Sequence, residues 1–177
     1  MNTYIALLRG INVGGKNLLP MKELVAIFEK LAARKVKTYI QSGNVVFQSE
    51  QELSQFSTRL AAGIKKSYGF EPQVLVLGLD AIENAMTANP YPEAEEDPKS
   101  LHLGFLASEP QNPDLEKLDS LRKESERFHL SEQVFYLHAP EGIGRSKLAA
   151  RAEKLLGVPM TSRNWRTVCK IKEMADQ

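Results

Sequence analysis

The sequence predicts an α+β fold of two ferredoxin-like halves, each an α/β plait of order βαββαβ with an antiparallel sheet, followed by a C-terminal helix. Strand-like and helix-like apolar periods follow one another in this order over residues 1–80, and the same order recurs after residue 100. An acidic, proline-rich segment separates the two series. With 177 residues, of which 42% are hydrophobic and 25% charged, the chain can bury a core of its own.

In the first half, the spacing of apolar residues places each element. The apolar run at residues 4–8 predicts a strand. Pro20 suits the first position of a helix because its missing N–H has no partner there, and apolar residues then recur at helical spacing. Residues 36–47 alternate on both sides of a Ser-Gly-Asn turn, which predicts a hairpin. A second helix ends near Gly69, and residues 73–79 complete the series as a strand.

The second half repeats the order of elements without repeating individual residues. The expected elements are a strand at 101–106, a helix at 114–121, a hairpin at 127–138, a helix at 146–156, a short extended piece at 160–162 and a helix from Trp165. A short helix and the acidic, proline-rich segment at 89–98 precede them and read as the connection. We therefore expect one domain at 1–80, a connection at 81–99 and a second domain at 100–177 with the C-terminal helix.

The sequence argues against metals, disulfides and membrane segments. Cys169 is the single cysteine, which excludes an intrachain disulfide and a cysteine-based zinc site and fits a reducing compartment. His102, His129 and His138 lie in separate expected strands, without the spacing of metal ligands. Arg9 comes too early for a signal peptide, and no run approaches the roughly 18 apolar residues of a membrane helix. We expect a cytoplasmic protein without metal, cofactor or membrane contact.

The net charge of +1 conceals an uneven distribution along the chain. Residues 1–47 contain seven Lys/Arg against two Asp/Glu, residues 48–139 eight against sixteen, and residues 140–177 eight against four. Two basic ends thus flank an acidic middle. The ordinary interpretation is that solvated faces differ in sign and that the basic ends pack near the acidic middle. The alternative is nucleic-acid binding by the combined basic ends.

The spacing Gly10-x-x-x-x-Gly15-Lys16 satisfies most of a phosphate-binding P-loop. Three features argue against that motif. Asn17 stands where a Ser or Thr would bind magnesium, and Pro20 places the helix start several residues late. The hairpin that follows belongs to an antiparallel sheet, whereas a P-loop needs a parallel one.

Topology gives a stronger argument for the same loop. In a βαββαβ unit the first and second strands run parallel, so the loop after the first strand and the turn of the central hairpin emerge at one edge. Cationic groups, small polar side chains and glycine amides would form a concave anion site there. The candidate residues are Arg9, Gly10, Asn12, Gly14, Gly15, Lys16, Ser42 and Asn44. In the structural alternative, the glycines supply positive φ, Asn44 caps a turn and Arg9 forms a salt bridge with a neighbour.

A second candidate anion site lies in the other half, where the loop before the fourth helix and the end of the final strand meet. Ser146 and Asn164 are good N-cap residues, so two helix N-termini flanked by basic side chains could receive an anion. The candidate residues are Arg145, Ser146, Lys147, Arg163, Asn164 and Arg166. Capping together with solvated basic residues explains the same pattern. Trp165 and Cys169, on one helix, are expected in the core.

Four segments carry a family resemblance, namely Ala6–Gly15, Thr38–Phe47, Ser146–Leu148 and Thr161–Thr167. They resemble signature motifs of the bacterial domain-of-unknown-function 1697 family. The resemblance spans nearly the whole chain and implies a fold of two ferredoxin-like α+β plaits. It implies no settled activity, so it strengthens the predicted architecture and leaves the function open.

The function that we expect is binding of a small phosphate- or carboxylate-bearing ligand at the edge that carries Arg9 and Lys16. No general base accompanies these cations, so no catalytic residue is assigned and enzymatic activity is left undecided. The first alternative is a non-catalytic protein-interaction or homodimerisation module, because ferredoxin-like folds commonly serve that purpose. Weak, salt-sensitive nucleic-acid binding ranks lower, because the sequence lacks aromatic pairs in neighbouring strands that would stack bases.

Overall fold

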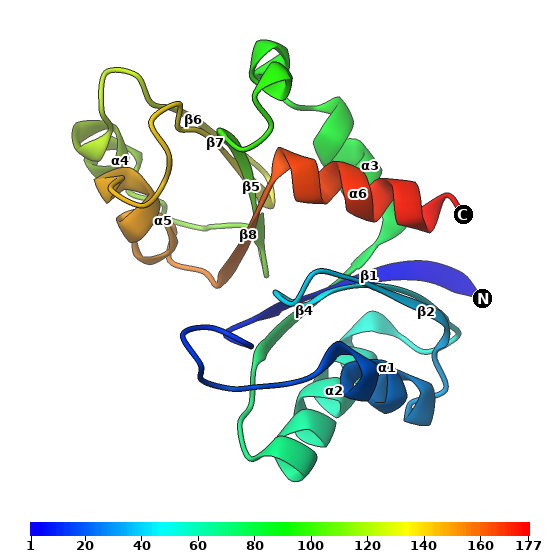
Figure 1. Cartoon of the computed structure of the whole chain (residues 1–177). Helices are drawn as coiled ribbons and strands as arrows, with labels where there is room; N and C mark the ends of the chain where they lie inside the picture. Colours follow the sequence, from blue (N-terminus) through cyan, green and yellow to red (C-terminus); the bar gives the residue numbers. More distant parts are fainter. The chain divides into compact units, whose positions relative to one another are not determined.

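The computed structural model describes residues 1–177, and these residues form two compact units. One unit comprises Met1–Asn84 with Lys170–Gln177, and the other comprises Ala85–Cys169. Each unit contains one four-stranded antiparallel sheet with helices against it (Figure 1). The predicted α+β class and the two βαββαβ plaits are therefore confirmed. The domain bounds expected from residue spacing remain a prediction.

The first sheet has the strand order β2-β3-β1-β4, and all neighbouring strands are antiparallel. Its unit contains β1 (Asn2–Arg9), α1 (Met21–Lys30), β2 (Arg34–Tyr39), β3 (Asn44–Ser49), α2 (Leu53–Tyr68) and β4 (Gln73–Gly78). Asn2 lies opposite Ser49, and Leu7 lies opposite Asn44. The end of β1 and the start of β3 thus lie at the same end of the sheet's strands. The loop after β1 and the β2–β3 turn also lie there.

Helices α1 and α2 cover one face of this sheet (Figure 1). Alternate residues of the central strands point to that face because side chains alternate along a strand. Phe28 of α1, Phe47 of β3 and Phe56 of α2 meet there and are almost fully buried. The ring centroid of Phe47 lies 5.0 Å from that of Phe28 and 4.5 Å from that of Phe56. This aromatic cluster anchors both helices to the sheet.

The second sheet has the strand order β6-β7-β5-β8, again antiparallel throughout. Its unit contains β5 (Leu101–Leu106), α4 (Leu115–Leu121), β6 (Arg127–Ser131), β7 (Val134–His138), α5 (Lys147–Leu156) and β8 (Met160–Asn164). α3 (Leu79–Thr87) and the 3₁₀ helix η1 (Pro92–Glu96) precede these elements, and α6 (Trp165–Ala175) follows them. Leu118 of α4, Leu148 of α5 and Phe135 of β7 share the core cluster of this unit. None of the helices combines the length and apolarity needed to cross a bilayer.

Some element ends differ from the predicted ones for identifiable reasons. Pro20 precedes α1, and its ψ of 139° is that of an extended residue at the helix cap. Asp114 is likewise the N-cap of α4, because its side chain accepts a hydrogen bond from Lys117 N. The final strand continues past its predicted end to Asn164, whose Oδ1 accepts from Thr167 N at 3.0 Å. Pattern alone located the elements, whereas these contacts decide where each one stops.

β2 is an edge strand of the first sheet, and its pairing with β3 is irregular. The register shifts between Arg34 and Lys37, and the intervening Lys35 has a φ of 50°. Lys37 Nζ donates to Met174 O of α6 at 3.2 Å. The outer edge of this sheet therefore carries a bulge flanked by basic residues.

Candidate functional site

The loop after β1 folds back on itself at its tip. Two backbone hydrogen bonds of 3.0 Å close the tip into a small hairpin, one from Asn12 N to Asn17 O and one from Lys16 N to Val13 O. Gly14 and Gly15 turn the chain with φ values of 57° and 71°. Apart from the adjoining residues of the chain, no heavy atom lies within 4 Å of the position that a Cβ would take at either glycine. Their backbone is therefore open to the approach of a ligand.

The Asn12 side chain fixes this hairpin to the β2–β3 turn. Its Nδ2 donates to Gln41 O at 2.9 Å and to Leu19 O at 2.9 Å, and its Oδ1 accepts from Leu19 N at 2.7 Å. Asn12 adopts a φ of 52°, a left-handed conformation that Asn tolerates better than most residues. Both amide hydrogens of Asn12 thus donate to backbone carbonyls, and the residue positions the two loops beside one another.

Gly43 brings the β2–β3 turn against the end of β1. Leu8 N donates to Gly43 O at 2.8 Å. Gly43 has a φ of 90°, and a Cβ at this position would lie 2.6 Å from Leu8 Cβ and 3.0 Å from Ile11 Cδ1. Only glycine permits this approach. The Ser-Gly-Asn signal in the sequence indicated a turn here, but it did not reveal the contact with β1.

Asn44 and Ser42, both predicted site residues, bond to each other within the turn. Asn44 is fully buried, and its Nδ2 donates to Tyr39 O and to Ser42 Oγ, each at 3.0 Å. These are the turn-capping contacts of the structural alternative for Asn44. Ser42 itself is exposed at the surface of the turn.

Two cationic side chains flank the paired loops. Arg9 ends β1, and its Nη1 donates to Oε1 of Gln73, the residue opposite it on β4, at 3.1 Å. Lys16 is exposed on the small hairpin, and Gly10, with a φ of 84°, is exposed between the two cations. A guanidinium, an ammonium and exposed glycine amides are the groups that bind phosphate or carboxylate oxygens in proteins. We call residues 9–18 with 40–44 the loop edge.

The second predicted constellation is held mainly by helix caps. Ser146 is buried, and its Oγ accepts from Ala149 N at 3.0 Å, while Asn164 caps α6. Both cap residues thus bond to the helices that they start. Three cationic side chains of this predicted site are exposed, those of Arg145, Lys147 and Arg166.

Arg163 lies apart from the cations near α5. Side chains of β8 alternate between faces, and Met160 packs into the cluster that contains the core residues of α5. Arg163 therefore lies on the opposite face of the sheet, where its Nη1 donates to Ser162 O at 3.0 Å. Burial lowers the pKa of Arg163 to about 10. Alternation along β8 thus separates Arg163 from the α5 side of the sheet, and the second anion site remains a prediction.

Comparison with known proteins gives the family. The family described as "Protein of unknown function (DUF1697)" matches residues 1–136. The chain belongs to this family. It is also similar to a solved structure described as "conserved bacterial protein SP0830 from Streptococcus pneumoniae", with 28% identity, a TM-score of 0.73 and coverage of 98% of each chain. No curated protein matches it. The predicted family resemblance is confirmed.

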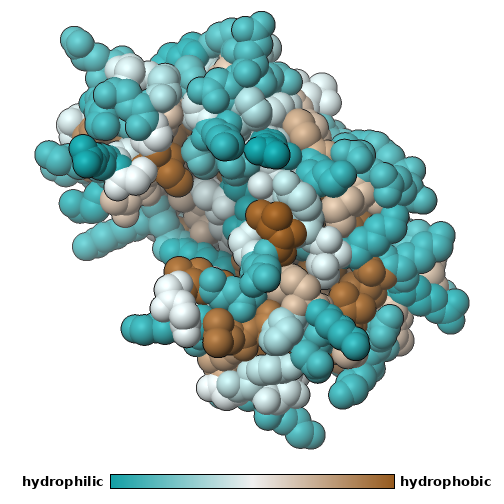
Figure 2. All heavy atoms as spheres, viewed as in Figure 1, coloured by the Kyte–Doolittle hydropathy of each residue, from teal (hydrophilic) through white to brown (hydrophobic).

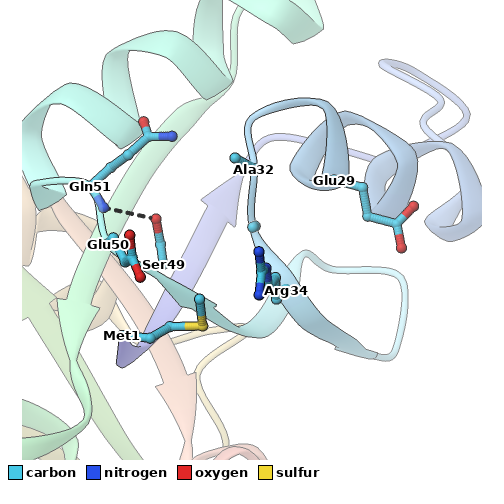
Figure 3. Close-up of a pocket in the computed structure, with 8 residues that line it drawn as sticks. Met1, Glu29, Ala32, Arg34, Ser49, Glu50 and Gln51 are labelled. Atoms are coloured by element: carbon cyan, nitrogen blue, oxygen red, sulfur yellow. Dashed lines mark hydrogen bonds between the residues drawn. The ribbon is translucent and has the colours of Figure 1, made fainter.

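This DUF1697 chain also has a cavity that sequence reasoning missed, at the opposite edge of the first sheet (Figure 3). Its volume is about 390 Å³, and it is lined by Met1, Glu29, Ala32, Ala33, Arg34, Ser49, Glu50 and Gln51. Arg34 faces the segment around Ser49 across the space (Figure 3). Gln51 N donates to Ser49 Oγ at 3.1 Å, and Gln51 Nε2 donates to Leu31 O at 2.6 Å.

The charges of this cavity differ from those of the loop edge. Its lining residues include the carboxylates of Glu29 and Glu50 and the guanidinium of Arg34. Its lining comes from separate segments without a shared motif, so no sequence pattern could have marked it.

In the second unit, Arg127 ties the acidic, proline-rich segment to the sheet. Its guanidinium pairs with Glu93 and lies 4.5 Å from the ring centroid of Tyr91, and its Nη2 lies 3.0 Å from His138 Nδ1. Burial, assisted by the positive charge of Arg127, lowers the pKa of His138. The acidic side chains from Glu93 to Asp97 are exposed, whereas Tyr91 and Ala94 within the same segment are buried.

Two buried polar side chains of the second unit keep an unpaired atom. His102 is 9% exposed with no hydrogen bond to Nδ1, and Glu126 is 1% exposed with none to Oε2. Burial lowers the pKa of His102, opposed by a backbone contact at Ser100. No three His, Cys, Asp or Glu side chains are grouped as metal ligands would be.

Proposed function

We propose that the chain binds a small phosphate- or carboxylate-bearing ligand at the loop edge. The observation that carries this proposal is the hydrogen bonding of Asn12, which holds the glycine-bearing hairpin and the β2–β3 turn together beside Arg9 and Lys16. A loop with a merely connecting role has no need for this arrangement. Loops held on a rigid scaffold are the usual location of binding residues.

The groups at the loop edge would contact an anion in different ways. Arg9 offers a planar fork that matches two oxygens of a phosphate or carboxylate, and Lys16 offers a mobile point charge. Gly14 and Gly15 are exposed residues, and their backbone amides can add donors. Hydrogen bonds to a charged ligand contribute about 1.5–3 kcal/mol each, so a few of them support micromolar to millimolar binding.

The proposal is for binding and names no reaction. Residues 9–18 and 40–44 contain no Asp, Glu, His or Cys that could act as a base or nucleophile. The interaction-module, homodimer and nucleic-acid hypotheses lack an observation of similar weight and remain predictions. The cytoplasmic location likewise remains a prediction.

A thermal-shift screen of nucleotides, sugar phosphates and organic acids at millimolar concentration tests the proposal. The wild type should gain stability with at least one of these anions, because a ligand that binds only the folded state raises the melting temperature. The double variant Arg9→Gln with Lys16→Gln should bind the same anion at least 10-fold more weakly. The matched control is Arg145→Gln with Lys147→Gln, which removes two exposed cations from the second unit and should keep wild-type affinity. Stabilisation that is absent from the wild type, or equal in all three proteins, would contradict the proposal.

A further inference from the structure

The loop edge carries exposed apolar side chains as well as cations. The large hydrophobic residues that are most exposed include Val13 at 65%, Leu18 at 63% and Ile40 at 52%. Val13 and Leu18 belong to the loop after β1, and Ile40 belongs to the β2–β3 turn. Single exposed apolar residues are ordinary on protein surfaces, but several on adjoining loops indicate a contact surface. Hydrophobic side chains are visible at the surface in the region of this loop (Figure 2).

The Asn12 hydrogen bonds link the chain segments that carry these three residues. Val13 follows Asn12 directly, Leu18 precedes Leu19, and Ile40 precedes Gln41. Leu19 and Gln41 are the two residues whose backbone Asn12 holds. Each exposed apolar residue is therefore adjacent in sequence to a residue of the Asn12 hydrogen-bond network, which consists of Asn12, Leu19 and Gln41. Lys16 belongs to the same hairpin, because its N–H donates to Val13 O at 3.0 Å.

Ile40 supplies a second, independent observation. Its φ is 49°, and a β-branched residue is a genuine outlier in this left-handed region. Glycine or asparagine would adopt this conformation with less strain. Backbone strain of this kind persists where the surrounding structure enforces it, and it concentrates at ligand-binding segments. An exposed isoleucine in a strained conformation contributes little to the stability of the fold. Its apolar surface is therefore better explained by contact with a ligand.

We propose that the ligand of the loop edge is an amphiphilic anion, in which a phosphate or carboxylate is joined to a hydrocarbon group. The anionic end pairs with Arg9, Lys16 and the glycine amides, and the hydrocarbon end lies against Val13, Leu18 and Ile40. This inference rests on the proposed function and specifies its ligand class. A purely polar anion, such as inorganic phosphate, would leave the three apolar side chains in water.

A chain-length series of straight carboxylates, from acetate through butyrate and hexanoate to octanoate, tests the inference by calorimetric titration. Each methylene that becomes buried should increase the affinity of the wild type up to about fourfold. The double variant Val13→Ser with Leu18→Gln should flatten this dependence and leave the affinity for acetate unchanged. The matched control is Leu115→Gln with Ile143→Ser, which removes two exposed apolar residues of the second unit and should keep the wild-type dependence.

A further variant, Ile40→Asn, separates binding from folding. Relief of the strained φ should raise the melting temperature by about 2–4 °C, whereas octanoate should bind several-fold more weakly. A loss of affinity together with a gain of stability cannot come from partial unfolding.

The outcomes separate the inference from the proposed function. If acetate binds and lengthening the chain changes nothing, the ligand-class inference is wrong and anion binding stands. If the dependence persists in the Val13→Ser, Leu18→Gln variant, the hydrocarbon binds elsewhere and the inference is again wrong. If none of the carboxylates binds, and the screen of phosphates is also negative, both proposals are wrong.

Discussion

The two βαββαβ units join their first strand to their first helix in different ways. In the first unit, residues 10–20 contain three glycines, a lysine and the exposed apolar residues Val13 and Leu18. In the second unit, residues 107–114 contain two prolines and two acidic residues, without glycine, lysine or arginine. The same connection of the fold is thus glycine-rich and basic in the first unit, and proline-containing and acidic in the second.

The two connections are also fastened differently. The second is fixed by backbone hydrogen bonds of 2.9 Å, from Ala107 N to Pro159 O and from Asp114 N to Leu155 O. The first depends on side-chain amides, mainly that of Asn12. The second unit shows that the fold needs neither glycines nor cations nor exposed apolar residues at this position. Their presence in the first unit therefore calls for an explanation outside folding, which agrees with the proposed binding role.

The largest expected loss of stability concerns Gly43, the glycine that allows the β2–β3 turn to pack against the end of β1. Gly43→Ala should destabilise the protein by about 2–4 kcal/mol, because the new Cβ meets Leu8 Cβ at 2.6 Å and the φ of 90° becomes strained. Gly104→Ala in the second unit should lose less, because its Cβ meets Met160 Sδ at 2.4 Å and a flexible methionine can move. Urea unfolding followed by circular dichroism measures both. A larger loss for Gly104→Ala would contradict the close packing described for Gly43.

A smaller effect should follow from loosening each connection in turn. Asn12→Gly keeps the positive φ accessible but removes three hydrogen bonds, so we expect a loss of about 1–3 kcal/mol. Asp114→Ala removes the N-cap of α4 and should lose about 1 kcal/mol. Only Asn12→Gly should also abolish the stabilisation by anions. Equal ligand responses in the two variants would show that the Asn12 network does not organise the site.

The weakest expected effect is a dependence of stability on pH that is confined to the second unit. His102, His129 and His138 all belong to it, and burial lowers the pKa of His102 and His138 in the folded protein. The unfolded chain therefore binds more protons near pH 6.5, so stability should fall as pH decreases below about 6.5 and stay level above it.

Tryptophan fluorescence measures this effect, because Trp165 is the single tryptophan and lies in the second unit. The midpoint of urea unfolding should be lower at pH 5.5 than at pH 7.5, and His102→Gln should reduce the difference. This range avoids the titration of most carboxylates. A midpoint that is the same at both pH values, or a difference that His102→Gln leaves intact, would refute the burial effect.

The architecture could be predicted because apolar period and turn residues are properties of the chain itself. The runs around Leu8 and Phe47 and the helical spacing after Pro20 each identify one element, and the order of elements fixes the plait. The shared edge of the β1 loop and the β2–β3 turn followed from the same order. The register of Leu7 opposite Asn44 agrees with it.

The candidate site could be predicted only as a location. Asn12 and Asn44 are polar residues in loops, and nothing in the sequence says whether their amides face a ligand or the backbone; the structure shows bonds to the backbone. Arg163 was grouped with Lys147 because the final strand was expected to end before it. The strand continues to Asn164, so alternation places Arg163 on the other face. The strain at Ile40 depends on a dihedral angle that no pattern of residue types encodes.

The bulged edge strand β2 affects how readily this protein aggregates at high concentration. A regular edge strand exposes unpaired backbone groups and can recruit a strand from another chain, which is how many sheets begin to aggregate. Lys35 interrupts that ladder with a φ of 50°, and this lysine is exposed. An incoming strand would meet a break in the hydrogen-bond pattern and would have to desolvate a charge. The first unit therefore carries a barrier against strand-by-strand polymerisation on the β2 side.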